Sequence, residues 1–239
     1  MLSVVKAKSY LPVAVVALLL LPPLACADST IYSNLNSDPA NLYASGGPFG
    51  VSNTVSSGQY QSVAAPFTTS VNADVTQLDL AMSFYPGGGG NFPGVTLTLV
   101  NDASGLPGKN VLFTDFRDIV PIVTFDLGGT CCALLTVNVG PGVSVLAGQT
   151  YWLIANPSDS NSTNFWQFNN TGATGWAIDY KFLPPDGTTL PDPNAWIAQN
   201  GARPAFAVLG TPTPEPSAMI SLFLGLLLLT AVSLRRGVI

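Results

Sequence analysis

The sequence predicts an all-β protein: an antiparallel, jelly-roll-like β-sandwich flanked by an N-terminal signal peptide and a single C-terminal hydrophobic helix. Three observations support this prediction. The 239-residue chain has 23 glycines and 20 prolines, and only 9% of its residues are charged, so the strong helix formers glutamate, lysine and arginine are scarce. Glycine, proline, asparagine, threonine and valine, which are typical of strands and turns, replace them. Several segments also alternate apolar and polar residues with period two.

The first 27 residues are typical of a secretory signal peptide. Two lysines precede an apolar run over residues 11–21, and two prolines then interrupt the helix. Ala25 and Ala27 provide the small–x–small pattern at which signal peptidase cleaves, so the mature chain is predicted to begin at Asp28. The apolar run is short for a membrane span, which disfavours a retained anchor. The other alternative is a lipoprotein lipidated at Cys26, and the residues Pro-Pro-Leu-Ala before it disfavour that.

The body is predicted to be one domain, residues 28–210, made of short strands. Apolar residues alternate with polar ones in residues 75–84, where Leu78, Leu80, Met82 and Phe84 share a face, and again in residues 94–100. A glycine-rich loop separates these two segments. Residues 150–156 are apolar on both faces, which predicts a central strand covered on both sides. Further strands are expected at residues 132–139, 175–182 and 204–210.

The C-terminal segment has three predicted parts. Residues 211–217 form an extended spacer, because their prolines fix φ near the polyproline value. Residues 218–236 form a transmembrane helix whose uncharged part covers about 25 Å and which ends in Arg235 and Arg236. Arginines beside a span favour the cytoplasmic side. The signal peptide and the tail therefore predict the same topology, with the body outside the membrane.

Pro214, Glu215, Pro216 and Ser217 form a short motif directly before the apolar run and the arginine pair. In this order, and at the C-terminus of a chain with a signal peptide, these features resemble the PEP-CTERM sorting signal of Gram-negative bacteria. The resemblance implies that a membrane-embedded exosortase processes the chain near the motif. It also implies that the body is first tethered at the inner membrane and then passes to the cell envelope or the extracellular polysaccharide matrix.

The body carries a second set of motifs. A strand ending in Asn-Asp is followed by Gly-Leu-Pro-Gly, and a Tyr-Trp-Leu strand is followed by the tryptophan-bearing stretch NFWQF. Over residues 31–209 the chain resembles the exported bacterial domains called choice-of-anchor, especially type R. The resemblance implies a β-sandwich at the cell surface. These domains share no biochemical activity, so the resemblance supplies no catalytic residues.

The composition disfavours several classes of function. The chain has no histidine, the usual general base of serine and cysteine hydrolases and the commonest ligand of zinc and copper. Its formal net charge is −5 and it has no basic stripe, which argues against binding nucleic acid. An aspartate-based glycosidase would need paired carboxylates, whereas most aspartates lie in predicted turns. We therefore predict a protein that is not an enzyme and uses no cofactor.

Two groups of oxygen-bearing side chains are considered as calcium ligands: Asn101, Asp102 and Ser104 in one loop, and Asp115, Asp118 and Asp126 further along the chain. Neither spacing matches an EF-hand. Gly105 and Pro107 indicate instead that the first loop is a tight turn. We predict a turn there and assign no metal ligand.

Six large aromatic residues could either bind sugar or fill the core: Trp152, Phe165, Trp166, Phe168, Trp176 and Trp196. Trp166 and Trp196 lie among asparagine, glutamine and proline, which makes them the candidates for stacking on exopolysaccharide. Core packing is favoured for Trp152, which lies in an apolar strand, and is placed ahead of sugar binding for the other two as well. A carbohydrate-binding module is the alternative function.

Cys131 and Cys132 are adjacent in the sequence. In a strand their side chains point to opposite faces. A bond between them would be strained, because neighbouring Cα atoms are only about 3.8 Å apart. The exported location favours disulfide chemistry. A vicinal disulfide, a free buried thiol and an intermolecular bridge all remain open.

Overall fold

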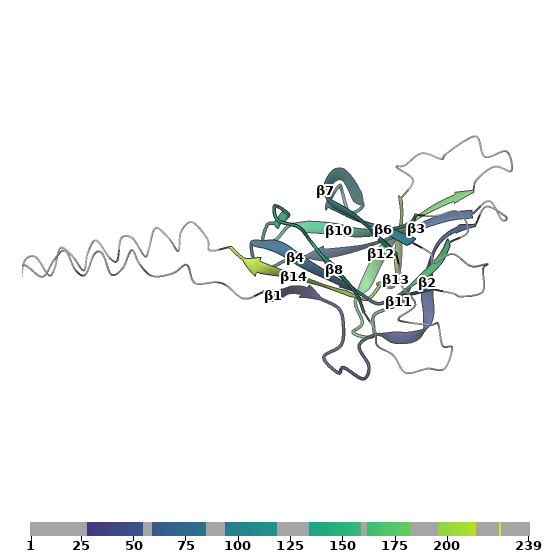
Figure 1. Cartoon of the computed structure of the whole chain (residues 1–239), viewed down its shortest axis with the longest axis horizontal. Coiled ribbons are helices and arrows are strands. Elements are labelled where there is room, and N and C mark those ends of the chain that lie inside the picture. The colour runs from purple at the N-terminus through teal and green to yellow at the C-terminus, as the bar shows by residue number, and fades with distance from the viewer. Residues whose placement is uncertain are drawn as a thin grey trace, which may run out of the picture.

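The computed structural model describes residues 28–54, 59–84, 94–118, 134–158, 162–182 and 196–213, together with Gly225. Within these ranges the chain forms fourteen strands arranged in two sheets (Figure 1). All strand pairs are antiparallel. The prediction of an all-β antiparallel fold is confirmed.

The first sheet has five strands. Four follow the order β1-β14-β4-β8, and β9 pairs with another part of β4. Their bounds are β1 Ser29–Ser33, β4 Ala73–Leu80, β8 Leu135–Asn138, β9 Ser144–Val145 and β14 Phe206–Pro212. The first and last strands of the body are therefore neighbours, although more than 170 residues separate them in the sequence.

The second sheet has nine strands. Seven follow the order β5-β11-β2-β3-β10-β6-β7, while β12 pairs with both β3 and β13. Their bounds are β2 Ala44–Thr54, β3 Gln59–Thr68, β5 Met82–Phe84, β6 Gly94–Asp102, β7 Pro107–Asp118, β10 Thr150–Pro157, β11 Ser162–Phe168, β12 Thr174–Phe182 and β13 Trp196–Ala202. The predicted strand at residues 94–100 lies within β6, and that at residues 150–156 lies within β10.

Residues 75–84 form parts of two strands rather than one. The shared apolar face is confirmed for Leu78, Leu80 and Met82, which are all buried in the same cluster. The chain leaves the first sheet after Leu80 and joins the second at Met82, so β4 and β5 belong to different sheets. At the break, the backbone of Ala81 donates to the carbonyl of Ala205 and accepts from the amide of Gln167, which satisfies its polar groups.

The main apolar cluster lies between the two sheets, as in a β-sandwich. Aromatic rings connect the sheets directly: Phe67 of β3 lies 5.5 Å from Tyr32 of β1 and 6.1 Å from Phe206 of β14, between ring centroids. Inward-facing residues of both sheets complete the cluster, among them Val75, Leu80, Val137 and Val208 of the first sheet and Val51, Val63, Leu97, Leu99, Leu153 and Trp166 of the second. This arrangement follows from period-two alternation along each strand.

A second apolar cluster lies on the other face of β10. Trp152 and Ile154 alternate with the residues that β10 contributes to the main cluster, and they pack with Ala64, Val100 and Ala177. Leu106 and Trp196 pack against this second cluster from outside. Because β10 lies between β3 and β6 and is buried on both faces, the prediction of a central strand is confirmed.

Candidate functional site

Most of the residues that carry the sorting prediction lie outside the described part of the chain. These are Ala25, Ala27, Pro214, Glu215, Pro216, Ser217, Arg235 and Arg236. Cys131, Cys132 and Asp126 lie outside it as well. No helix within the described ranges is both long and apolar enough to cross a membrane. The predicted helix at residues 218–236 belongs to the undescribed part, apart from Gly225.

Trp166 is a core residue rather than an exposed one. Its side chain is completely buried, with its ring centroid 5.8 Å from that of Phe206, and its Nε1 donates to the carbonyl oxygen of Ala205 at 2.9 Å. Trp166 therefore offers no face to a sugar ring, which corrects its place among the sugar-binding candidates. The polar neighbours that suggested exposure are themselves buried, since Asn164 and Gln167 are 0% and 5% exposed.

Trp196 is half-buried at the beginning of β13, directly opposite Asp179 of β12. Its indole packs against the second cluster, so part of its ring already has an apolar partner. Trp152, deeper in this cluster, is 4% exposed, and its Nε1 donates to Oδ1 of Asp102 at 2.7 Å. The preference for core packing is confirmed for Trp152.

The loop that follows β6 is a tight turn, as predicted. The amide of Ala103 donates to the carbonyl of Leu106 at 2.8 Å, and the amide of Gly105 donates to Oδ2 of Asp102 at 3.0 Å. Ser104 and Gly105 adopt positive φ values of 58° and 83°. Asp102 thus accepts hydrogen bonds with both carboxylate oxygens, one in the turn and one from Trp152, which gives it a structural role.

Several other aspartates also accept hydrogen bonds from neighbouring protein groups. Asp79 accepts from Nε2 of Gln77 at 2.9 Å and from Oγ1 of Thr136 at 2.7 Å, and Asp74 accepts from Oγ of Ser144. Asp115 and Asp118 lie on β7. In the part of the chain that the structure describes, no three carboxylate or thiol side chains gather closely enough to hold a metal ion.

The partly buried Arg203 fixes the junction between the sheets. Its guanidinium donates to the carbonyls of Gly175, Thr174 and Pro66 and to the hydroxyl of Tyr32, at 2.6 to 3.0 Å. These acceptors come from both sheets, so the side chain acts as a rigid fork between them. The sequence gives no sign of this role, because three backbone carbonyls and the Tyr32 hydroxyl, all distant along the chain, are the acceptors.

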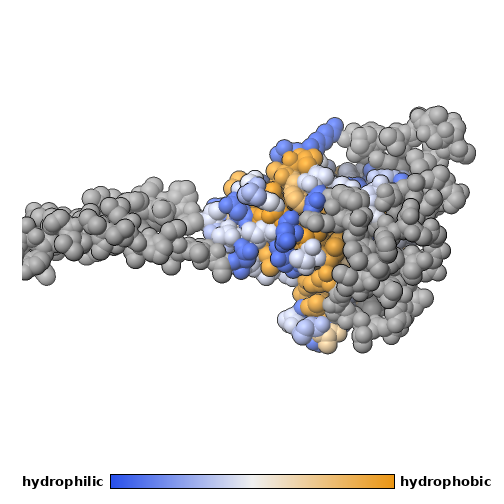
Figure 2. All heavy atoms as spheres, viewed as in Figure 1, coloured by the Kyte–Doolittle hydropathy of each residue, from blue (hydrophilic) through white to orange (hydrophobic). Residues whose placement is uncertain are grey.

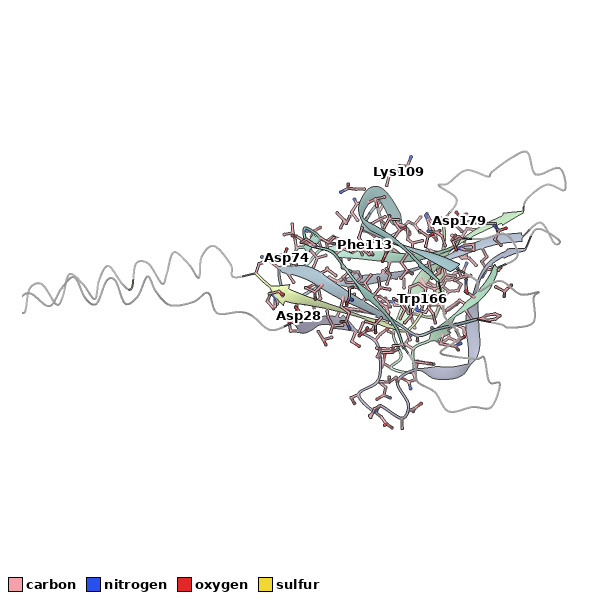
Figure 3. The ribbon with its side chains drawn as sticks, viewed as in Figure 1. Asp28, Asp74, Lys109, Phe113, Trp166 and Asp179 are labelled. Atoms are coloured by element: carbon pink, nitrogen blue, oxygen red, sulfur yellow. The ribbon has the colours of Figure 1, made fainter. Side chains whose placement is uncertain are left out.

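Both ends of the described body lie together at one end of the first sheet. Ser29 pairs with Gly210, and Oγ1 of Thr211 donates to Oδ1 of Asp28 at 2.9 Å (Figure 3). The amide of Thr213 donates to the carbonyl of Asn72 at 2.9 Å. Strand β14 therefore continues to Pro212, two residues beyond the end of the body expected from the sequence.

A glycine is required where β14 approaches β4. At Gly210 an added Cβ would lie 2.5 Å from the carbonyl oxygen of Asp74, too close for any side chain. The register between the two strands shifts at this point, between Leu209 and Gly210. Gly210 therefore allows the last strand to remain paired up to the beginning of the tail.

Two turns form the surface beside the end of β14. Turn 69–72 connects β3 to β4, and turn 146–149 connects β9 to β10. The amide of Gly148 donates to the carbonyl of Thr69, and the amide of Ala147 donates to Oδ1 of Asn72, both at 2.8 Å. The two turns and the first residue after β14 are thus held together around Asn72. We refer to this surface as the exit end of the body.

Neither a protein-family model nor a curated protein matches this sequence.

Proposed function

We propose that this chain is an exported, non-enzymatic protein of the cell envelope or extracellular matrix of a Gram-negative bacterium. Residues 1–27 act as its signal peptide. Residues 211–236 act as a PEP-CTERM-type signal, which tethers the body to the inner membrane until an exosortase processes it. The order of motif, apolar run and arginines supports this proposal, as does the resemblance of the body to choice-of-anchor domains.

The observation that carries the proposal furthest is the pairing of β1 with β14. The pairing places the predicted start of the mature chain beside the start of the tail, so both predicted processing sites lie at the same end of the body. The four residues 214–217 can span at most about 14 Å when extended. While the tail is in the membrane, this end of the body is therefore the one that lies nearest to the membrane surface.

The same pairing pattern supports a jelly-roll-like arrangement of the sheets. Strand pairs nest inside one another along the chain: β1 with β14, β2 with β11, β3 with β10, β4 with β9, and β6 with β7. A long antiparallel hairpin that is rolled up into two sheets has this nesting, which is the topology of jelly rolls.

The non-enzymatic part of the proposal rests on the lack of histidine and on what the aspartates do. The carboxylates of Asp74, Asp79 and Asp102 are engaged by neighbouring hydroxyl, amide or indole donors. Recognition of exopolysaccharide by exposed aromatics is the alternative, and the burial of Trp166 leaves it with Trp196 alone.

Mass spectrometry of the native C-terminus tests the sorting proposal. In protein recovered from the envelope or matrix of its own cells, we expect the last peptide to end near Pro216 and the peptide that reaches Ile239 to be absent. A Glu215→Ala chain expressed in the same cells is the control, because it keeps the apolar run but loses the motif. An intact C-terminus in the mature pool of the natural chain would show that the tail is an ordinary anchor.

A further inference from the structure

The exit end of the body exposes two apolar side chains on its neighbouring turns. Leu146 is 57% exposed and Val71 is 38% exposed, and both are among the few large apolar residues that the described body leaves in solvent. Their turns are tied together by the hydrogen bonds around Asn72. In Figure 2 hydrophobic residues lie among hydrophilic ones on the coloured face of the described body.

Hydrogen bonds with neighbouring side chains hold the backbone of these two residues in place. Oγ1 of Thr69 donates to the carbonyl of Val71 at 2.7 Å, and the amide of Leu146 donates to the hydroxyl of Tyr151 at 2.9 Å. Tyr151 is itself 7% exposed and contributes its ring to the main cluster. The turns that expose Leu146 and Val71 are therefore fixed by the fold, and these two side chains are the large apolar groups that this surface exposes.

The short distance along the chain from this surface to the predicted membrane helix indicates what the surface faces. Thr213 is bonded to Asn72, the residue after Val71, and the predicted membrane helix begins five residues later, at residue 218. The four intervening residues span at most about 14 Å. If residues 218–236 lie in a membrane, the two turns must lie within reach of that membrane's surface.

We propose that the exit end rests on the lipid surface, with Leu146 and Val71 entering the interface between headgroups and acyl chains. The inference rests on the proposed function, because it requires the tail to be in the membrane. The exit end of the body would then contact the membrane surface, and the body would dissociate from the lipid when the tail is cleaved. Transfer of apolar side chains from water into this interface lowers their free energy.

The charges at the exit end favour an uncharged lipid surface over an anionic one. Within its two turns and the strand ends beside them, residues 28–29, 69–74, 144–149 and 210–213, the charged side chains are Asp28 and Asp74 (Figure 3). Cleavage before Asp28 adds one α-ammonium group there, which leaves a net negative charge of one. Carboxylates are repelled by anionic lipid and are tolerated at a zwitterionic surface. We therefore expect contact with phosphatidylcholine and weaker contact when anionic lipid is added.

Quenching of an introduced tryptophan by brominated lipid tests the proposal. The full chain, carrying Leu146→Trp, is reconstituted in phosphatidylcholine vesicles with or without bromine on the acyl chains. We expect most of the emission that Leu146→Trp adds to the natural chain to be lost in the brominated vesicles. Val71→Trp provides a second reporter on the neighbouring turn, and the same loss is expected there.

Ile197→Trp is the matched control. Ile197 is 55% exposed, close to the value for Leu146, and lies on β13 of the second sheet. Its added emission should be equal in both kinds of vesicle. If the two exit-end reporters are also unquenched while the chain floats with the vesicles, the lipid contact is wrong and the anchor stands. An unquenched but blue-shifted reporter would indicate that the residue is buried against a second copy of the chain, which also overturns the lipid contact. A chain that fails to float would overturn the anchor and this inference together.

Discussion

Each of the two apolar clusters of the body contains a buried tryptophan whose indole donates a hydrogen bond, but the clusters are enclosed to different degrees. In the main cluster, Trp166 has a sheet on either side and no exposed surface. In the second cluster, Trp152 lies on the outer face of β10, covered by Leu106 and by the half-buried Trp196. Each inner indole donates to an oxygen of the protein, at 2.9 Å in one case and 2.7 Å in the other. Because the main cluster is covered by a sheet on each side, we expect the stability of the body to depend mainly on it.

The largest expected effect is that of Trp166→Ala. Removing a fully buried indole leaves a cavity between the sheets, and such changes cost about 3 to 5 kcal/mol in the free energy of unfolding. Denaturant unfolding of the body, followed by circular dichroism, measures this loss. Trp166→Phe is the control, because it retains an aromatic ring and removes one of the two donors to the carbonyl of Ala205, leaving the amide of Ala81; we expect a smaller loss. A Trp166→Ala body as stable as the natural one would contradict the enclosed core.

An intermediate effect is expected from Asp102→Ala in the second cluster. This change removes the acceptor of the Trp152 indole and of the Gly105 amide, and such hydrogen bonds contribute about 1 to 2 kcal/mol. The same unfolding experiment measures the loss of stability. Because Asp102 is assigned no role in binding metal, added calcium should not change the stability of either chain. Asp79→Ala is the matched control, since its partners Gln77 and Thr136 can turn to water. If added calcium stabilised the natural chain but not Asp102→Ala, the structural role of this turn would be wrong.

The smallest effect is expected from Trp196→Ala. Because this side chain is half-buried at the edge of the second cluster, its removal should cost about 1 kcal/mol and leave the fold intact. We expect binding to the matrix polysaccharide to be unchanged, as measured by co-sedimentation. Trp152→Ala, which truncates the buried neighbour, should cost more. Loss of polysaccharide binding by Trp196→Ala alone, with stability retained, would instead support the carbohydrate-binding alternative.

Local patterns predicted the strands well where neighbouring residues alone decide the structure. The alternation at residues 94–100, the two-faced apolar segment at residues 150–156 and the turn around Gly105 all appear in the structure as expected. The pattern failed at residues 75–84, where the apolar face is continuous but the hydrogen-bond partners change from one sheet to the other. Period two reports which side of a strand is buried, and it carries no information about which strand lies beside it.

The candidate site shows the same limit. Polar neighbours made Trp166 look exposed, but Asn164 and Gln167 are buried with hydrogen-bond partners of their own: the side chain of Asn164 donates to Gly94, and that of Gln167 donates to Ser83. These partners lie 70 and 84 residues away along the chain. A short segment of the sequence does not contain these partners. Local sequence patterns therefore cannot distinguish a buried polar network from an exposed loop.

The sequence by itself determined the all-β class, the sides of several strands and the predicted export and sorting segments, because composition and short-range alternation express local preferences. Tertiary structure alone decided that β1 and β14 are neighbours, that Arg203 joins the sheets, and that the turns carrying Leu146 and Val71 lie together beside the end of β14. These features depend on hydrogen bonds between residues far apart in the chain. Such contacts exist only once the sheets have formed, since it is the folded sheets that bring their partners together.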